Sequence, residues 1–157
     1  MSTPIAAVRE ITSSDPERTR ALGSALAAVA APGDVICLWG DLGAGKTQLA
    51  KGFGAGLGIT DTVTSPSFVL MAEYRGRLPL FHIDLYRLAT AEDALAGGLI
   101  DERQSSGVTL IEWPDRLGAA LPADRLDIRL DGTGDEPRIL TLRASGDRHA
   151  RYLAVAA

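Results

Sequence analysis

The pattern of apolar and polar positions in the first part of the chain predicts a strand, a helix and a second strand. Residues 4–10 are expected to form a short strand. A capping box, in which the Ser14 hydroxyl accepts a hydrogen bond from the Glu17 amide, predicts a helix that ends near Ala30. The apolar run at 34–39 then predicts a buried strand.

A further helix is expected from Lys46 to about Leu57, because apolar side chains recur every four residues on one of its faces. Glycine nevertheless occupies positions 52, 54 and 56 of this helix. Each glycine costs a helix about 1 kcal/mol relative to alanine. We expect a close approach of the helix to a sheet to explain these glycines.

The second half of the chain predicts two β-hairpins and one further buried strand. The first hairpin joins residues 67–75 to 78–84, and the second joins 126–130 to 138–143. The apolar run at 108–111 predicts the buried strand. These elements predict one α/β domain with three layers, a mixed sheet and β-hairpins. Shorter helical segments are expected at residues 91–96 and 114–117.

Composition narrows the classes of protein to which the chain can belong. A net charge of −4 over 157 residues does not suit unaided binding of nucleic acid, so we expect no DNA binding and contact with RNA only through a partner. No apolar run approaches the ~20 residues of a membrane span, and no secretory signal is visible. The single cysteine, Cys37, is expected to be a core residue, which fits a reducing cytoplasm.

Residues 40–47, Gly-Asp-Leu-Gly-Ala-Gly-Lys-Thr, match a phosphate-binding loop between a predicted strand and a predicted helix. The glycines let successive backbone amides point at phosphate oxygens, and the helix N-terminus adds its dipole. Lys46 is expected to reach the β- and γ-phosphates, and Thr47 to bind Mg²⁺. This predicts a P-loop nucleotidase that binds a nucleoside triphosphate with magnesium. The candidate nucleotide-binding positions here are Gly40, Asp41, Leu42, Gly43, Ala44, Gly45, Lys46, Thr47 and Gln48.

Two acidic residues follow apolar strands and are candidates for the chemistry. Asp84 follows the run at 78–83, and Glu112 follows the run at 108–111. One carboxylate can ligate Mg²⁺ and the other can orient or deprotonate the attacking water, and the pattern leaves open which does which. Either can also be a solvated acid at a strand end. His82 shares a strand face with Asp84 and either tunes that acid or is a structural histidine.

Hydroxyl groups and a tryptophan add further candidates near the nucleotide. Thr64, Ser65 and Ser67 lie together around a proline. They form either a loop that senses the γ-phosphate or a polar turn before a strand. Trp113 directly follows the second acid and is either a nucleotide contact or an aromatic residue of the rim or core.

Four segments in order resemble the signature sequences of the TsaE (YjeE) family, the bacterial ATPases of tRNA threonylcarbamoyladenosine synthesis. The resemblance covers roughly residues 10 to 145, and the last three segments are much more specific than the phosphate loop. The segments are Gly40–Thr47, Val63–Phe68, His82–Leu88 and Ile111–Asp115.

This resemblance implies that the chain binds and slowly hydrolyses ATP with Mg²⁺. It implies two partner proteins, TsaB and TsaD, which transfer the threonylcarbamoyl group to the tRNA adenosine beside the anticodon. Thr64 to Ser67 match a switch-like loop of the family. Ser67 stands where the family usually has threonine, so the hydroxyl is kept with less steric definition.

Carried over position by position, the resemblance also implies roles for single residues. Thr47 and Glu112 match the magnesium ligands, and Asp84 matches a second acid that hydrolysis needs. With Lys46, these two acids are the candidate catalytic residues. Arg138 falls where the family has a late basic residue near the nucleotide.

Three other functions compete with this hypothesis. A small-molecule kinase needs a lid with several arginines and a helical insert, whereas the stretch before Glu112 is predicted mainly as a hairpin. A GTPase typically uses an Asn-Lys-x-Asp motif, but the chain has no asparagine and its only lysines are Lys46 and Lys51. A regulatory subunit whose nucleotide merely orders a partner surface overlaps with the family role.

Overall fold

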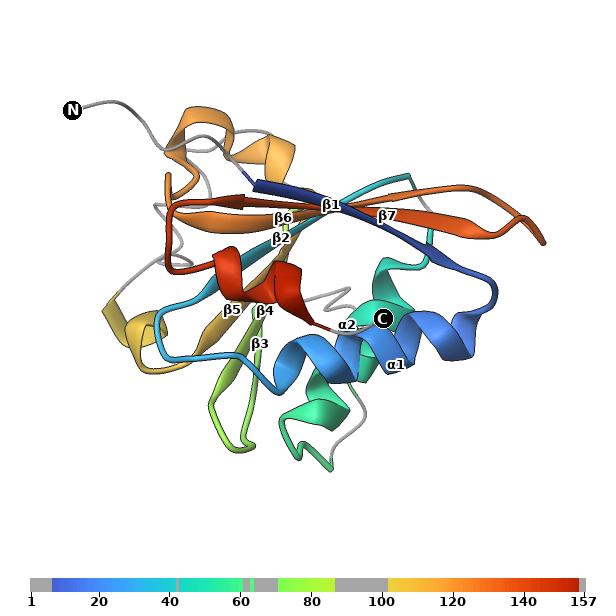
Figure 1. Cartoon of the computed structure of the whole chain (residues 1–157). Helices are drawn as coiled ribbons and strands as arrows, with labels where there is room; N and C mark the ends of the chain where they lie inside the picture. The colour runs from blue at the N-terminus through green and yellow to red at the C-terminus, as the bar shows by residue number, and fades with distance from the viewer. Residues whose placement is uncertain (1–6, 42, 61–62, 64–70, 87–101, 156–157) are drawn as a thin grey trace.

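The computed structural model describes residues 7–41, 43–60, 63, 71–86 and 102–155, which form an α/β fold around one mixed sheet (Figure 1). The strand order is β1-β7-β6-β2-β5-β4-β3. The strands are β1 (Ala7–Ser13), β2 (Val35–Trp39), β3 (Met71–Tyr74), β4 (Leu80–Asp84), β5 (Val108–Glu112), β6 (Arg125–Asp131) and β7 (Arg138–Ser145). The helices are α1 (Pro16–Ala27) and α2 (Lys46–Gly56), with 3-10 segments η1 (Glu102–Ser106), η2 (Pro114–Arg116), η3 (Gly118–Ala120) and η4 (Ala150–Ala154). No helix in these ranges has the length and apolar character needed to cross a bilayer.

The centre of the sheet is parallel and its edges are antiparallel. β2 pairs in parallel with both β5 and β6, and β5 pairs in parallel with β4. The antiparallel pairs β3–β4 and β6–β7 confirm both predicted hairpins, although residues 67–70 of the first lie outside the described residues, and β1 adds to β7. The predicted α/β class and mixed sheet are therefore confirmed. The short helix predicted at 91–96 lies outside the described residues.

The first strand and the first helix differ from the predicted boundaries. β1 runs to Ser13, beyond the predicted end at residue 10. The predicted cap was wrong: the Asp15 carboxylate, not the Ser14 hydroxyl, accepts from a backbone amide, that of Arg18 at 2.8 Å. The cap moves by one residue because Asp15 directly precedes the proline of the first turn and aspartate is as good a cap as serine.

Both α-helices cover the same face of the sheet (Figure 1). Alternate residues of β2 divide between two apolar clusters. Ile36 and Leu38 pack in the cluster that contains Phe53 of α2, whereas Cys37 packs on the opposite face with Leu117 from the η2–η3 segment. Burial raises the pKa of the Cys37 thiol to about 12, so this residue is a neutral core side chain, as predicted.

Glycines let α1 and α2 approach each other closely. A Cβ atom on Gly52 would lie 1.9 Å from the Arg20 carbonyl oxygen, and one on Gly23 would lie 2.3 Å from the Leu49 carbonyl oxygen. Gly56 also faces α1, with a Cβ position 2.6 Å from a carbonyl oxygen of that helix. The expected helix-to-sheet approach was therefore wrong for Gly52 and Gly56, because the contact they permit is between the two helices.

Replacing Gly52 with alanine is expected to destabilise the fold by about 3 kcal/mol, the upper end of overpacking penalties. Helix propensity alone predicts the opposite sign, a gain of about 1 kcal/mol. Urea denaturation of both proteins measures the difference. Ala55→Gly on the exposed side of the same helix is the control and is expected to cost only about 1 kcal/mol. A Gly52→Ala protein more stable than the wild type would contradict this account of the helix contact.

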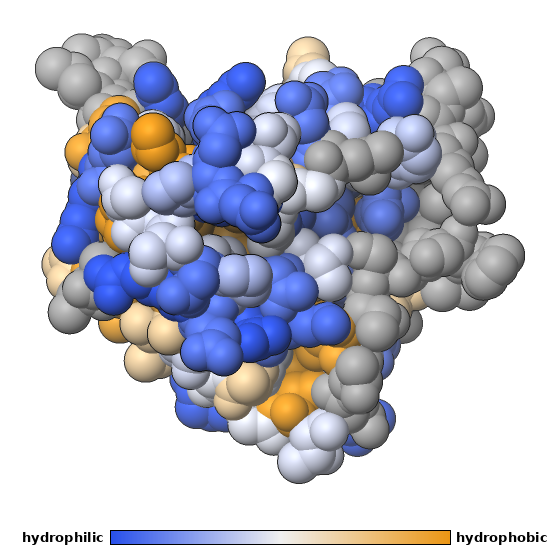
Figure 2. Space-filling view, turned by 90° about the vertical axis from the view of Figure 1, so that its right-hand side faces the viewer, coloured by the Kyte–Doolittle hydropathy of each residue, from blue (hydrophilic) through white to orange (hydrophobic). Residues whose placement is uncertain are grey.

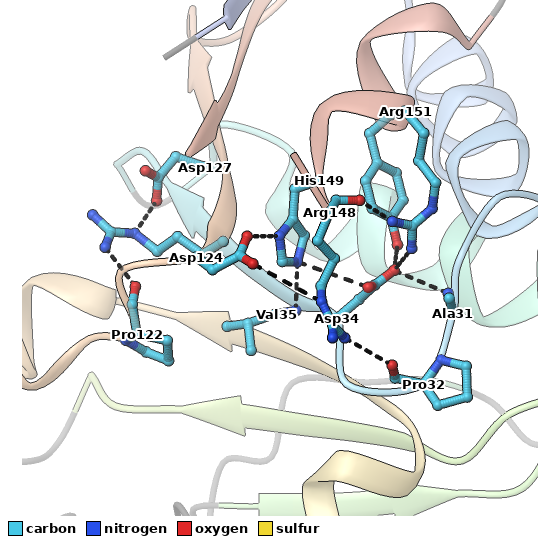
Figure 3. Close-up of polar contacts among 12 residues, drawn as sticks. Ala31, Pro32, Asp34, Val35, Pro122, Asp124, Asp127, Arg148, His149 and Arg151 are labelled. Atoms are coloured by element: carbon cyan, nitrogen blue, oxygen red, sulfur yellow. Dashed lines mark hydrogen bonds and ion pairs between the residues drawn. The ribbon is translucent and has the colours of Figure 1, made fainter. Parts of the chain in front are cut away.

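A buried carboxylate just before β2 holds the segment that follows β7. Asp34 is fully buried, and its Oδ2 accepts hydrogen bonds from the Ala31 amide at 2.9 Å and the Tyr152 hydroxyl at 2.5 Å (Figure 3). The Arg151 guanidinium also pairs with Oδ2. Burial and the hydrogen bond to Asp34 raise the pKa of Tyr152, which keeps its hydroxyl protonated as the donor.

His149 provides a second anchor for the same segment. Its ring is fully buried, and its Nε2 accepts a hydrogen bond from the Val35 amide at 3.0 Å. The ring proton must therefore lie on Nδ1, which donates to Asp124 Oδ1 at 2.7 Å (Figure 3). The two anchors fix the first residues of β2, the strand that leads directly to the predicted phosphate loop.

Replacing Asp34 with alanine is expected to lower the free energy of unfolding by about 3 kcal/mol, because it leaves the buried Tyr152 hydroxyl without its acceptor and removes the ion pair with the partly exposed Arg151. Thermal and denaturant unfolding measure the loss. Asp131→Ala is the matched control: this carboxylate is exposed and pairs with Arg129 at 3.4 Å, so we expect a change within about 0.5 kcal/mol. Equal effects of the two substitutions would show that Asp34 is no anchor.

Candidate functional site

The predicted phosphate loop joins the central strand β2 to α2 at the carboxyl end of the parallel part of the sheet. Three of its glycines have left-handed or related backbone angles: φ is 144° at Gly40, 82° at Gly43 and 105° at Gly45. Gly45 is the N-cap of α2, and no described side chain caps the helix there. A Cβ atom on Gly43 would meet no described atom within 4 Å. The geometry is that of a backbone cradle for an anion.

Lys46, the first residue of α2, is 5% exposed and is held by neutral partners. Its ammonium donates to the Gly40 carbonyl oxygen at 2.7 Å and lies 3.8 Å from the centre of the Trp113 ring. Burial lowers the pKa of Lys46, and the negative charges of Glu112 and Asp84 oppose that shift. The ammonium therefore contacts the loop and lies close enough to both acids to feel their charge.

The parallel register brings the two predicted acids together. Asp84, the last residue of β4, pairs with Glu112, the last residue of β5, and Glu112 in turn pairs with Leu38 of β2. Burial raises the pKa of Asp84, whereas the Tyr86 amide, which donates to its Oδ1 at 2.9 Å, lowers it. The two carboxylates thus leave neighbouring strands at the edge where the phosphate loop begins.

His82 contacts Glu112, whereas the sequence pattern had suggested Asp84 as the acid that it tunes. The His82 Nε2 atom lies 2.6 Å from Glu112 Oε2, and these two side chains are 0% and 4% exposed. Sequence position could not reveal this contact, because His82 and Glu112 belong to different strands and only the register joins them.

Trp113 has an unusual backbone conformation beside the loop. Its φ of 58° and ψ of 51° place a bulky non-glycine residue in the left-handed region. The ring faces Lys46 and also contacts Tyr86, with 4.9 Å between ring centroids. Tyr86, which was not among the predicted site residues, is 45% exposed. Strained conformations of this kind concentrate at functional sites.

Arg138, the predicted late basic residue, reaches the phosphate loop from the first position of β7. Its guanidinium donates to the Ala44 carbonyl at 3.2 Å and to the Gly43 carbonyl at 3.2 Å. Gln48 points instead toward α1, where its Oε1 accepts from Arg20 at 3.0 Å. The predicted residues Leu42, Thr64, Ser65 and Ser67 lie outside the described residues.

The donor set suits magnesium. Among the described residues, no group of three or more His, Cys, Asp or Glu side chains is arranged to hold a metal ion by itself. Mg²⁺ needs only one or two carboxylates when water and phosphate oxygens complete its octahedron. Glu112, Asp84 and the Thr47 hydroxyl supply hard oxygen donors around the loop, and this edge of the molecule is largely hydrophilic (Figure 2).

Comparison with known proteins indicates the same family as the four sequence segments described above. Residues 13–140 match the family model described as Threonylcarbamoyl adenosine biosynthesis protein TsaE. The chain is 46% identical over 136 residues to the tRNA threonylcarbamoyladenosine biosynthesis protein TsaE of Bacillus subtilis, covering 86% of this chain and 85% of the relative. The protein of that name from Streptomyces coelicolor is 40% identical, with 83% and 93% covered.

A solved structure supports the fold independently of the motifs. The crystal structure of YdiB from Bacillus subtilis superposes with a TM-score of 0.79 at 38% sequence identity, covering 97% of this chain and 95% of that one. The family match contains the phosphate loop, both acids and the first residues of β7. The chain therefore belongs to the TsaE family of threonylcarbamoyl adenosine biosynthesis proteins.

Proposed function

We propose that this protein is a P-loop ATPase that binds Mg-ATP, hydrolyses it slowly and thereby supports threonylcarbamoyladenosine modification of tRNA. The observation that carries the proposal is the convergence of Lys46, Asp84 and Glu112 on one glycine-rich loop. The relatives named above are tRNA threonylcarbamoyladenosine biosynthesis proteins, which supports the cellular role. For this role we propose a cytoplasmic location.

In this proposal the loop amides and the N-terminus of α2 bind the triphosphate, and Lys46 exchanges the Gly40 carbonyl for phosphate oxygens. Thr47 and Glu112 hold Mg²⁺, which neutralises charge on the β- and γ-phosphates when bound. Asp84 orients the attacking water or accepts its proton. Its raised pKa makes it a better base than an ordinary aspartate. Arg138 braces the loop through its carbonyls.

The partners in this proposal are TsaB and TsaD, and tRNA contact is indirect through them. A chain with net charge −4 lacks the basic excess of a protein that holds RNA by itself. The absence of asparagine argues for ATP rather than GTP, because the usual guanine-reading motif contains that residue. A small-molecule kinase remains the alternative, and phosphorylated product in a screen of hydroxylated acceptors would favour it.

The Lys46→Ala and Glu112→Ala proteins are expected to lose stimulation of tRNA threonylcarbamoylation, because the first loses a phosphate contact and the second a metal ligand. The measurement is modified tRNA formed by TsaB, TsaD, tRNA and a threonylcarbamoyl donor with each protein. Lys51→Ala, which removes the only other lysine of the chain from the same helix, is the control and should stimulate normally. Full stimulation by Lys46→Ala and Glu112→Ala would refute the ATP-dependent role.

The Asp84→Asn protein is expected to be more stable than the wild type at pH 7 and to lose hydrolysis. Burial raises the pKa of Asp84 in the folded protein, so its ionisation above that pKa lowers the stability of the folded state. Below the unfolded pKa of about 3.9, the carboxyl group is neutral in both the folded and the unfolded protein, and this cost disappears. The melting temperature difference should therefore shrink as the pH falls below 4. Asp131→Asn on the exposed end of β6 is the control. An Asp84→Asn protein with a lower melting temperature than the wild type at pH 7 would contradict the stability cost assigned to the ionised Asp84.

A further inference from the structure

We propose that His82 is a positioning residue that fixes the orientation of the Glu112 carboxylate, and so sets how well the site binds the metal–nucleotide complex. This inference rests on the proposed function, since it assigns Glu112 to the magnesium. The contact is direct: His82 Nε2 lies 2.6 Å from Glu112 Oε2, and both side chains are buried. His82 itself touches neither the phosphate loop nor Lys46 in any described contact.

The hydrogen bonding assigns the tautomer of His82. A carboxylate only accepts hydrogen bonds, so His82 Nε2 must carry the proton and donate it to Glu112. The other ring nitrogen, Nδ1, is buried and has no hydrogen-bond partner among the described residues. A bare nitrogen lone pair there costs less than a buried N–H without an acceptor, so Nε2 is the nitrogen that must carry a proton.

The sheet geometry explains why this side chain can hold Glu112 in place. Leu80 and His82 lie on the face of β4 that is covered by α2. β4 pairs in parallel with β5, and His82 pairs with Leu110, two register positions before the Asp84–Glu112 pair. His82 therefore approaches Glu112 from inside the sheet, behind the edge that faces the loop. A rigid donor in that place restricts rotation of the carboxylate. Comparable outer partners of metal ligands change metal affinity or activity by about 10- to 100-fold when removed.

A purely structural role of His82 predicts a different experimental result. If His82 only satisfied a polar position of the core, its removal would lower stability and leave the metal dependence of the folded protein unchanged. A positioning role changes the metal requirement and keeps metal-free nucleotide binding. The two roles are therefore separable by measurements on folded protein.

The first test uses the metal-free, nucleotide-free full chain and does not depend on activity. The chain has two histidines, so long-range ¹H–¹⁵N spectra of the imidazoles resolve both rings. We expect opposite tautomers: Nε2–H for His82 and Nδ1–H for His149, whose Nε2 accepts from the Val35 amide. His149 is thus an internal reference. A His82 ring whose proton lies on Nδ1 and whose Nε2 is bare would overturn the proposal.

The second test compares His82→Leu with His82→Gln, whose amide N–H can occupy the position of Nε2–H. The Mn²⁺ concentration that half-saturates the protein–ADP complex is measured by the electron paramagnetic resonance of free Mn²⁺, and ATP hydrolysis is titrated with Mg²⁺. We expect His82→Leu to raise both requirements about tenfold, and His82→Gln to stay within about threefold of wild type. ADP affinity without metal should not change in either variant.

The control is His149→Gln, which perturbs the other buried histidine away from the loop and should lower the melting temperature without changing the metal requirement. Unchanged metal dependence in His82→Leu, with hydrolysis lost in Glu112→Ala, would overturn the role of His82 and leave the proposed function intact. Wild-type protein that neither binds nor hydrolyses ATP would instead refute the proposed function. If His82→Leu does not fold, the tautomer measurement and His82→Gln still decide the proposal.

Discussion

β5 lies between β2 and β4 and pairs with both in parallel, and the site is assembled by that arrangement. Parallel strands that start together also end together, so the loop after β2 and the last residues of β4 and β5 reach the same edge of the sheet. Glu112 stands in register with Leu38 on one side and Asp84 on the other. A shift of β5 by one residue would turn Glu112 to the opposite face and remove it from the loop.

Features that depend on local sequence were predictable. The phosphate loop, the strand before it and the helix after it follow from glycine spacing and apolar periodicity, and both hairpins follow from their turns. The contact of His82 with Glu112 was not predictable, because it depends on the register of two strands. Asp34 and its partners Arg151 and Tyr152 are 117 and 118 positions apart, so no local pattern joins them. Gly52 was visible as an anomaly, but only the helix crossing explains it.

The site contains buried charged side chains. The Lys46 ammonium rests on a carbonyl oxygen and an aromatic face, which are weaker partners than phosphate, and burial disfavours both its charge and that of Asp84. The negative oxygens of a nucleotide can therefore replace these weaker contacts. The strained backbone of Trp113 is part of the same preorganisation, because it turns the ring toward Lys46.

The anchoring of β2 by the end of the chain also bears on synthesis by the ribosome. The strand that leads into the phosphate loop starts at residues held by His149 and Tyr152, and the N-terminal strand β1 pairs with β7. These partners emerge well after β2 during translation, so the nascent strand at first lacks the contacts that order it. Pairing across nearly the whole length makes folding slow relative to locally connected domains. The strand that leads into the loop therefore gains its anchors only after the residues of η4, far downstream in the chain, have been released.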